Sequence, residues 1–205
     1  GAQERTAGEI QLDGVPRNPR SPWDAIRMGL ALVPGDRKRL GGVADWTLRE
    51  NLTLPKILGR GPLRWLAGTW DGRQVASLLE RPAVTPNNTK AGFSSLSGGN
   101  QQKIMIARWL RCEARAYLLE EPTAGVDVGA KSAIYAALRE LAVGGAAVLM
   151  TTSDLEEACA VCDRVYVVHE GQVAAELRGA RLTVDNLLAE MLRPTTTSRE
   201  NIDHA

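Results

Sequence analysis

Strand-like and helix-like segments alternate along the second half of the chain, and this alternation constrains the fold more than any other feature. "YLLE" at 117–120 and "AAVLMTT" at 146–152 are short apolar runs, and a segment with helical spacing at 129–141 lies between them. Strands that alternate with helices of this length form βαβ units, whose strands run parallel and whose helices cover the sheet. We therefore expect an α/β fold with a mostly parallel sheet and helices on its faces.

The amino-terminal region predicts a strand, a helix and a second strand of the same core. "GEIQLDG" at 8–14 alternates with period two, and "LALVP" at 30–34 is a short apolar run typical of a buried strand. Between them, "SPWDAIRMG" at 21–29 indicates a short helix, because Ser21 can cap it and Pro22 suits its first position.

Residues 42–110 show helical signals and no convincing strand. Thr47 and Glu50 have the spacing of a capping box, which predicts that a helix begins there. The other expected segments are a polar, glycine-rich loop at 35–46, an irregular stretch at 55–72, a helix at 73–80 and a loop at 81–92. We therefore expect a helical insertion lobe within the α/β chain.

The carboxy-terminal region predicts a hairpin, a helix and a tail. Residues 164–177 are expected to form two strands joined at Glu170-Gly171, and 183–192 a last helix, followed by a disordered polar segment. The predicted division of the chain is an α/β segment at 1–41, the helical lobe with its glycine-rich motif at 42–110, a second α/β segment at 111–192 and the tail at 193–205.

Charge and cysteine content argue against several classes of function. The chain has 25 Lys and Arg against 24 Asp and Glu, a balance that argues against nucleic acid bound through a large positive field. No apolar run approaches the roughly 20 residues of a membrane span. Three cysteines, an odd number, favour a reducing compartment. We interpret Cys159 and Cys162 as two small thiols on one helical face, and His169 and His204 as structural or exposed.

The stretch "SSLSGGNQQK" is the most specific motif of the chain. Ser97, Gly98 and Gly99 lie where a loop turns into a helix, and glycine lets the backbone approach a ligand closely. The first N–H groups of a helix lack intrahelical partners and, with the helix dipole, favour an anion. These residues predict a phosphate site, and an ordinary glycine-rich helix start is the alternative.

Two adjacent carboxylates, Glu120 and Glu121, end the apolar run at 117–120. Successive side chains of a strand point to opposite faces, so the two acids can serve different roles. One can hold Mg²⁺, directly or through water, and the other can orient or deprotonate an attacking water. A solvated strand end is the alternative interpretation.

Together these motifs resemble the ATP-binding subunit of an ABC transporter, which has a P-loop NTPase-like fold. "LSGGNQQK", "LLEEPTAGVDVGAK" and "TTSDLEEACAVCDRVYVVHEG" have the order and spacing of the signature motif, Walker B, D-loop and switch region. "LSGGNQQK", "GVDVGAK" and "ALVPGDRKR" are similar in particular to the second cassette of double-cassette sugar importers. The resemblance covers residues 1–192 and implies ATP and Mg²⁺ as cofactors.

The resemblance also implies that ATP lies between two cassettes arranged head to tail. The signature residues that would serve a nucleotide held by the partner cassette are Ser97, Gly98, Gly99, Asn100 and Gln101. Glu121 matches the catalytic glutamate that polarises water for this chain's own nucleotide, and Glu120 matches the Walker B Asp that supports Mg²⁺. Asp127 matches the D-loop acid at the dimer interface, and Ser153 lies at the switch position.

The partners that the resemblance implies place the chain at the cytoplasmic face of a membrane. The helical lobe would dock on transmembrane permease subunits, and a periplasmic or extracellular solute-binding protein would act indirectly. The assembly would couple ATP hydrolysis to the uptake of a solute, with a sugar as the expected solute.

Several positions depart from the family pattern. The phosphate loop of Walker A, G-x-x-x-x-G-K-[ST], does not occur in the sequence. In the family it lies upstream of the strand at 8–14, so we expect this chain to begin after it and, alone, to bind ATP weakly and hydrolyse it negligibly. Four positions carry a different residue from the family pattern. Glu120 replaces an Asp, and Gly35 replaces a Gln or Glu. Ser153 replaces a His, and Ala124 replaces an Arg. Ser153 and Glu156 also have capping-box spacing, which offers a purely structural interpretation.

Two alternative functions remain open. The chain could be a degenerate, non-hydrolytic cassette that lends its signature loop to an ATP site in a partner. It could also be a soluble ABC ATPase of translation or DNA repair, which docking of residues 42–92 on a membrane subunit would exclude.

Overall fold

The computed structural model describes residues 3–58, 84–85, 87–110 and 112–193 of the 205-residue chain, without the side chains of Lys38 and residues 55–58. The chain divides into two compact units, Gly1–Thr151 and Thr152–Ala205. The predicted helix at 73–80 lies outside the described residues, as does the predicted tail apart from Arg193. Within the described ranges, no helix has both the length and the apolar character needed to cross a bilayer.

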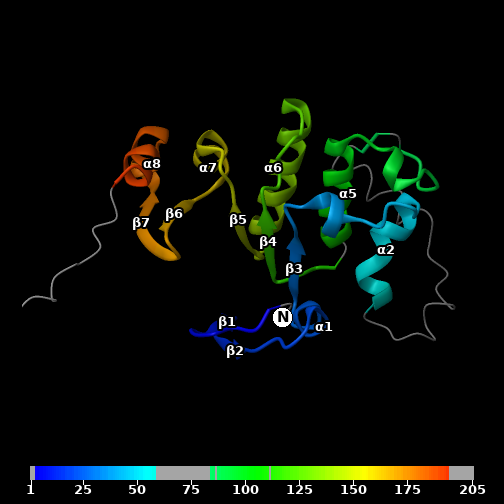
Figure 1. Cartoon of the computed structure of the whole chain (residues 1–205), viewed down its shortest axis with the longest axis horizontal. Coiled ribbons are helices and arrows are strands. Elements are labelled where there is room, and N and C mark those ends of the chain that lie inside the picture. Colours follow the sequence, from blue (N-terminus) through cyan, green and yellow to red (C-terminus); the bar gives the residue numbers. More distant parts are fainter. Residues whose placement is uncertain (1–2, 59–83, 86, 111, 194–205) are drawn as a thin grey trace, which may run out of the picture. The chain divides into compact units, whose positions relative to one another are not determined.

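The first unit is built on a three-stranded parallel sheet, as the sequence predicted. Its strands are β3 (Leu30–Val33), β4 (Ala116–Glu120) and β5 (Ala147–Thr151). They lie side by side in the order β3-β4-β5 (Figure 1), and both pairs are parallel. Because the strands are parallel, their carboxyl ends meet at one edge of the sheet, where ligands bind in open α/β folds.

Two helices cover one face of this sheet, α5 (Gly98–Leu110) and α6 (Val128–Val143). The buried residues of this core include Ala31, Val33, Tyr117, Leu119, Met105, Ile134 and Leu138. The alternate residues of the strands point to the other face, where Leu32 is 45% and Leu149 60% exposed. The core therefore lies between the sheet and its two helices.

Capping residues set the starts of the helices in this unit. Ser21 Oγ accepts the Asp24 N–H at 3.1 Å and begins α1 (Pro22–Arg27), as predicted. Asp127 Oδ1 accepts the Ala130 N–H at 2.9 Å and begins α6, a role that the sequence interpretation did not give to this residue.

A hairpin of β1 (Ile10–Leu12) and β2 (Val15–Arg17) precedes α1. The sequence predicted only the first strand. Asp13 and Gly14 turn the chain with φ of 53° and 71°, which brings β2 back along β1. The second strand has three residues, one of them Pro16, and so carries a weak strand signal.

The helical part of the first unit contains α2 (Leu48–Leu58) and a 3-10 turn, η2 (Phe93–Ser95). The predicted capping box is present, because Glu50 Oε2 accepts the Thr47 N–H at 2.8 Å and Thr47 Oγ1 accepts the Glu50 N–H at 3.3 Å. Two predictions are wrong here. A π-helix, η1 (Arg37–Gly41), occurs in the predicted loop at 35–46, and α2 continues to Leu58 where an irregular stretch was expected.

The buried guanidinium of Arg108 connects α5 to α2 and η1. Its Nε donates to the Asn51 carbonyl at 2.8 Å, and its Nη1 donates to the Gly41 carbonyl at 2.6 Å. Pro55 has no N–H, so the helical hydrogen bond to the Asn51 carbonyl is missing and Arg108 takes its place. Burial lowers the pKa of Arg108 to about 10, which leaves it protonated at neutral pH.

The second unit contains α7 (Leu155–Val161), the hairpin β6 (Arg164–His169) and β7 (Gln172–Arg178), η3 (Gly179–Arg181) and α8 (Val184–Met191). The predicted hairpin and last helix are confirmed. Its core is formed by Ala158, Val167, Leu177 and Leu187. The cap of α7 is Asp154, which accepts the Glu157 N–H at 3.0 Å, so the capping box proposed for Ser153 and Glu156 is wrong. His169 Nε2 lies 3.2 Å from the Glu190 carbonyl, a structural contact.

Candidate functional site

The two adjacent acids lie at the carboxyl end of β4. Glu120 is the last residue of the strand and pairs with Thr151 of β5. The Glu121 N–H also donates to the Thr151 carbonyl, at 2.8 Å, but Glu121 has left the strand and has a φ of +44°. A positive φ is costly for a residue with a Cβ atom and is found where the surrounding structure enforces it, often at functional sites. Because Glu121 lies outside β4, strand alternation does not orient it as the sequence predicted, and the turn of the backbone at Glu121 sets its direction instead.

Glu120 connects the ends of two neighbouring strands. Its Oε2 accepts the Gly35 N–H at 3.0 Å, and Gly35 lies just beyond the carboxyl end of β3. A Cβ atom on Gly35 would lie 3.3 Å from Glu120 Cβ, so glycine permits this close approach. No protein donor reaches the other carboxylate oxygen among the described residues. This exposed oxygen could hold Mg²⁺ directly or through water.

The helix α5, which begins in the predicted signature motif, starts beside this edge with N–H groups that have no acceptor in the described part of the chain. Ser97 is exposed, and its Oγ accepts the Asn100 N–H at 3.4 Å. No acceptor for the N–H groups of Gly98 and Gly99 occurs among the described residues, and these two glycines begin α5, a helix of 13 residues. The helix dipole adds partial positive charge to these orphan donors. Such an arrangement could receive a phosphate oxygen, with a further hydrogen bond from the Ser97 hydroxyl, and phosphate binding here stays a prediction.

Two signature side chains hold the loop itself. Asn100 Nδ2 donates to Ser97 Oγ at 3.2 Å, and its Oδ1 accepts the Thr85 N–H at 3.1 Å. Gln101 Nε2 donates to the carbonyls of Phe93 and Leu96, at 3.3 and 3.2 Å. The structure thus gives Asn100 and Gln101 structural partners that the sequence did not reveal, and their contact with a nucleotide stays a prediction.

A third loop, the D-loop segment before α6, lies against the start of the signature helix. A Cβ atom on Gly99 would lie 3.6 Å from Asp127 Oδ2 and 3.7 Å from Val126 Cγ1. Asp127 is exposed although its other oxygen caps α6. It can therefore serve a partner across an interface and begin a helix at the same time, and the first of these roles stays a prediction.

Arg37 is a residue of the site that the sequence interpretation missed. Its Nη1 donates to the Ala124 carbonyl at 2.7 Å. A Cβ atom on Gly98 would lie 2.7 Å from Arg37 Nη2, and one on Gly125 would lie 3.0 Å from it. The guanidinium therefore bridges the D-loop segment and the signature loop. Its contact with Ala124, 87 positions away, leaves no local signal in the sequence.

The segments at 35–37 and 124–125 border a shallow cavity of about 300 Å³, lined by Gly35, Asp36, Arg37, Ala124 and Gly125. Within the described part of the chain, no three His, Cys, Asp or Glu side chains cluster as a metal site. Magnesium commonly uses one or two carboxylates and completes its octahedron with ligand phosphates and water, so Glu120 fits that mode. Ser153 lies in the second unit, where it precedes the α7 cap and is exposed.

The fold and this edge define an α/β nucleotide-binding cassette of the P-loop NTPase-like type. The fold is similar to the crystal structure of a nucleotide-free ATP-binding cassette from an ABC transporter, with a TM-score of 0.72, 24% identity, and coverage of 92% of this chain and 76% of that chain.

The family model for ABC transporters matches residues 1–124, and the chain belongs to this family. It is 40% identical over 183 residues to the ribose import ATP-binding protein of Pseudomonas putida, covering 89% of this chain and 36% of that protein. It is 41% identical over 192 residues to the arabinose import ATP-binding protein of Azospirillum brasilense, covering 92% of this chain and 36% of that protein. The chain thus spans little more than a third of the length of these relatives.

Proposed function

We propose that this chain is the second, C-terminal cassette of an ABC importer of sugars, and that it takes part in coupling ATP hydrolysis to uptake. The observation that carries the proposal is the convergence of three loops on one edge of the sheet. The Glu120 carboxylate and the Asp127 segment come from one stretch of sequence, the orphan N–H groups after Ser97 from a second, and Gly35, which contacts Glu120, from a third. We propose a sugar as the solute because the two relatives are named as ribose and arabinose import proteins.

In the proposed mechanism the residues divide the work of phosphate transfer. ATP supplies the phosphoryl group, and Mg²⁺ would neutralise charge on its phosphate oxygens. Glu120 supports the cation through its outer oxygen. Glu121 orients a water molecule and accepts its proton. Ser97 and the N–H groups of Gly98 and Gly99 would donate hydrogen bonds to phosphate oxygens of a second ATP, the one held by the partner cassette.

The proposed assembly pairs this chain with a second cassette. A phosphate loop does not occur in this sequence, so a partner is proposed to hold the ATP that the signature loop contacts. Transmembrane permease subunits would receive the helical lobe at the cytoplasmic face of the membrane, and a solute-binding protein would deliver the sugar to them.

A transport assay tests this function. The assembled importer is reconstituted with its permease in vesicles, and uptake of labelled ribose and arabinose is followed with and without ATP. We expect ATP-dependent uptake of at least one sugar, lost on Glu121→Gln because an amide cannot accept the proton of the attacking water. Uptake that needs no ATP, or that survives Glu121→Gln at full rate, would contradict the proposal.

The second candidate is a non-hydrolytic cassette that only lends its signature loop. It is favoured by one observation: the Gly35 N–H already occupies one oxygen of Glu120, which leaves a single oxygen for Mg²⁺. In this case Glu121→Gln would have little effect while Ser97→Ala would still lower transport.

A further inference from the structure

A second cavity lies at the opposite edge of the parallel sheet. It has a volume of about 330 Å³ and is lined by Arg17, Asp24, Arg27, Met28 and Arg115. Arg115 directly precedes β4, whereas Glu120 ends that strand. Five residues of strand span roughly 16 Å, so this cavity and the candidate ATP site are separate.

Three different elements bring the arginines together. Arg17 ends β2, Arg27 is in the last turn of α1, and Arg115 follows the loop into β4. The Arg115 N–H donates to the Gly29 carbonyl at 2.8 Å. Gly29, with a φ of +89°, lies under the Arg115 side chain, because a Cβ atom there would be 3.2 Å from Arg115 Cγ. The backbone thus fixes where Arg115 enters the cavity.

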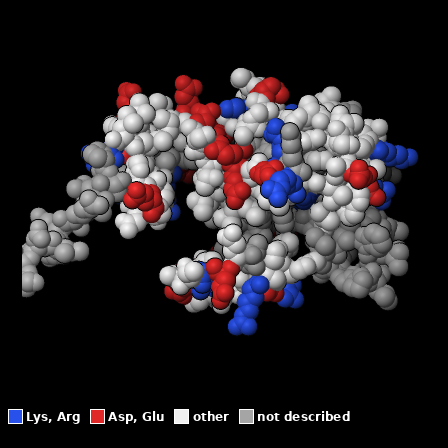
Figure 2. Space-filling model, in the orientation of Figure 1, with Lys and Arg blue, Asp and Glu red and all other residues white. Residues whose placement is uncertain are grey.

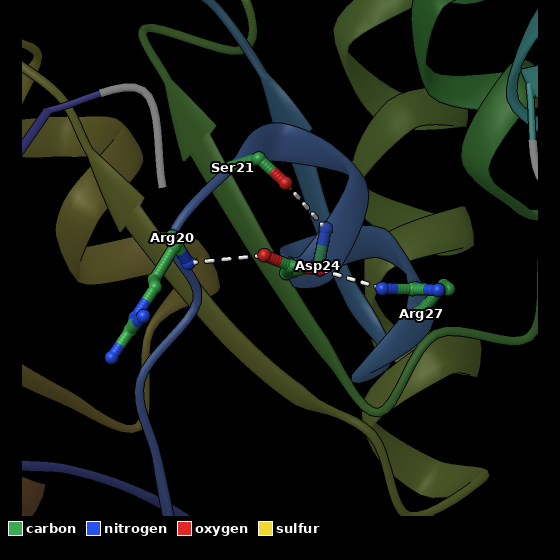
Figure 3. A network of polar contacts seen from close by, with 4 residues as sticks. All are labelled: Arg20, Ser21, Asp24 and Arg27. Carbon is green, nitrogen blue, oxygen red and sulfur yellow. Dashed lines mark hydrogen bonds and ion pairs between the residues drawn. The ribbon is translucent and has the colours of Figure 1, made fainter.

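Two of the arginines have carboxylate partners. Asp24 Oδ1 accepts Arg27 Nη2 at 2.7 Å, and its Oδ2 accepts the Arg20 N–H at 3.3 Å (Figure 3). The hydrogen bond from Arg27 lowers the pKa of Asp24, so this carboxyl is ionised at neutral pH. Asp13, from the β1–β2 turn, pairs with Arg115. Acidic and basic side chains are mixed over β1, β2 and α1 (Figure 2).

Arg17 has no such partner. Its Nε is buried and makes no hydrogen bond among the described residues. A buried donor without an acceptor is costly, and more so when it belongs to a charged group. The negative charge of Asp24 balances Arg27, and that of Asp13 balances Arg115. The positive charge of Arg17 has no carboxylate to balance it among the described residues.

We propose that this cavity binds a phosphate group, either inorganic phosphate or a soluble phosphate monoester. Guanidinium groups donate pairs of parallel hydrogen bonds that match the geometry of phosphate oxygens. Arg17 lines the cavity with a charge that no described carboxylate matches and could donate from its Nη groups, and Arg27 and Arg115 retain N–H groups beyond those used by their carboxylates. The volume leaves room for a small organic group on the phosphate. The site would let a phosphorylated metabolite act on the cassette away from ATP.

Titration of the full chain tests this site. Inorganic phosphate and glycerol 3-phosphate are added separately in a low-salt chloride buffer, and affinity is followed by calorimetry and by the rise in melting temperature. We expect both to bind, Arg17→Gln and Arg115→Gln each to weaken binding about tenfold, and about 0.5 M salt to weaken it further. Arg17→Lys, which keeps the charge but not the planar fork, is expected to fall between wild type and Arg17→Gln.

Controls separate this cavity from other anion sites. Arg178→Gln removes an exposed positive charge from β7, which does not line the cavity, and is expected to leave binding unchanged. If Ser97→Ala weakens phosphate binding and the cavity variants do not, the ion is at the signature helix and the proposal fails. Absence of binding, equal binding by all variants, or binding only to phosphatidic acid vesicles would also overturn it. Arg115 is exposed, so its variant keeps the test decisive if Arg17→Gln does not fold.

Discussion

Gly42 lies against the buried ring of Phe93, and this contact requires glycine. A Cβ atom at position 42 would lie 2.6 Å from Phe93 Cε1 and Cζ. The φ of Gly42 is −141°, which any residue can adopt, so the requirement is one of packing. Phe93 is 4% exposed and belongs to the core of the helical region.

We therefore predict that Gly42→Ala lowers the free energy of unfolding by about 1–3 kcal/mol through overpacking. Gly92→Ala is the matched control, because a Cβ atom there would meet only Ser94 Oγ, at 4.0 Å. Urea unfolding of the two variants measures the difference. Equal free energies of unfolding for the two variants would show that the Phe93 ring can move away from a Cβ atom at position 42 without loss of stability.

At the scale of single residues, local chemistry was predictable and long-range contacts were not. Ser21 was found as a cap because capping depends on neighbours three positions away. For Asp127 the family resemblance predicts only a place at the dimer interface, and the residue also caps α6, a role that the resemblance does not indicate. Arg37 was missed because its partner Ala124 is distant in sequence.

The start of α2 depends on the ionised carboxylate of Glu50. Hydrogen bonds from the Thr47 hydroxyl and N–H lower the pKa of Glu50 below its ordinary value of 4.5. A group whose folded pKa is lowered contributes stability above its unfolded pKa and loses it as the pH falls through the folded pKa.

We predict that Glu50→Gln lowers the free energy of unfolding by about 0.5–1 kcal/mol at pH 7. The difference from wild type is expected to shrink below pH 4.5 as the carboxylate protonates. Denaturation at pH 7, 5 and 3 measures it, with Glu176→Gln, in β7 of the second unit, as a control variant. A difference that does not change with pH would contradict the capping box.

The junction of α2, η1 and α5 depends on Arg108. Its loss orphans the Asn51 carbonyl, which Pro55 cannot satisfy, and the Gly41 carbonyl. We predict that Arg108→Gln lowers the free energy of unfolding by about 2–4 kcal/mol. Pro55→Ala restores an N–H, so the same change should cost about 1 kcal/mol less in that background. A double-mutant cycle measures the coupling, and additive effects would contradict it.

At the scale of elements, strong patterns predicted most of the first unit. The parallel sheet was predictable because its strands are short apolar runs separated by helical segments. The strand β2 was missed because three residues with a proline carry little pattern. The continuation of α2 through Pro55 was missed because a distant arginine compensates for the absent N–H.

At the scale of the whole molecule, the sequence predicts signature, Walker B and D-loop segments, and the pattern G-x-x-x-x-G-K-[ST] does not occur in its 205 residues. A phosphate loop supplies most of the hydrogen bonds to the β- and γ-phosphates in proteins of this kind. We predict that calorimetric titration of this chain alone with Mg-ATP shows affinity no tighter than the millimolar range. Micromolar affinity would contradict this prediction.

The loop at Ser97 and the acid Glu121 are proposed to act on ATP within an assembled transporter. The most direct test is the ATPase rate of that assembly with Ser97→Ala, Glu121→Gln and, as a control, Arg178→Gln. We predict a fall of about tenfold or more for Ser97→Ala and about 100-fold or more for Glu121→Gln, with the control unchanged. A fall for Ser97→Ala alone would favour the lending cassette, and unchanged rates for both variants would contradict the account.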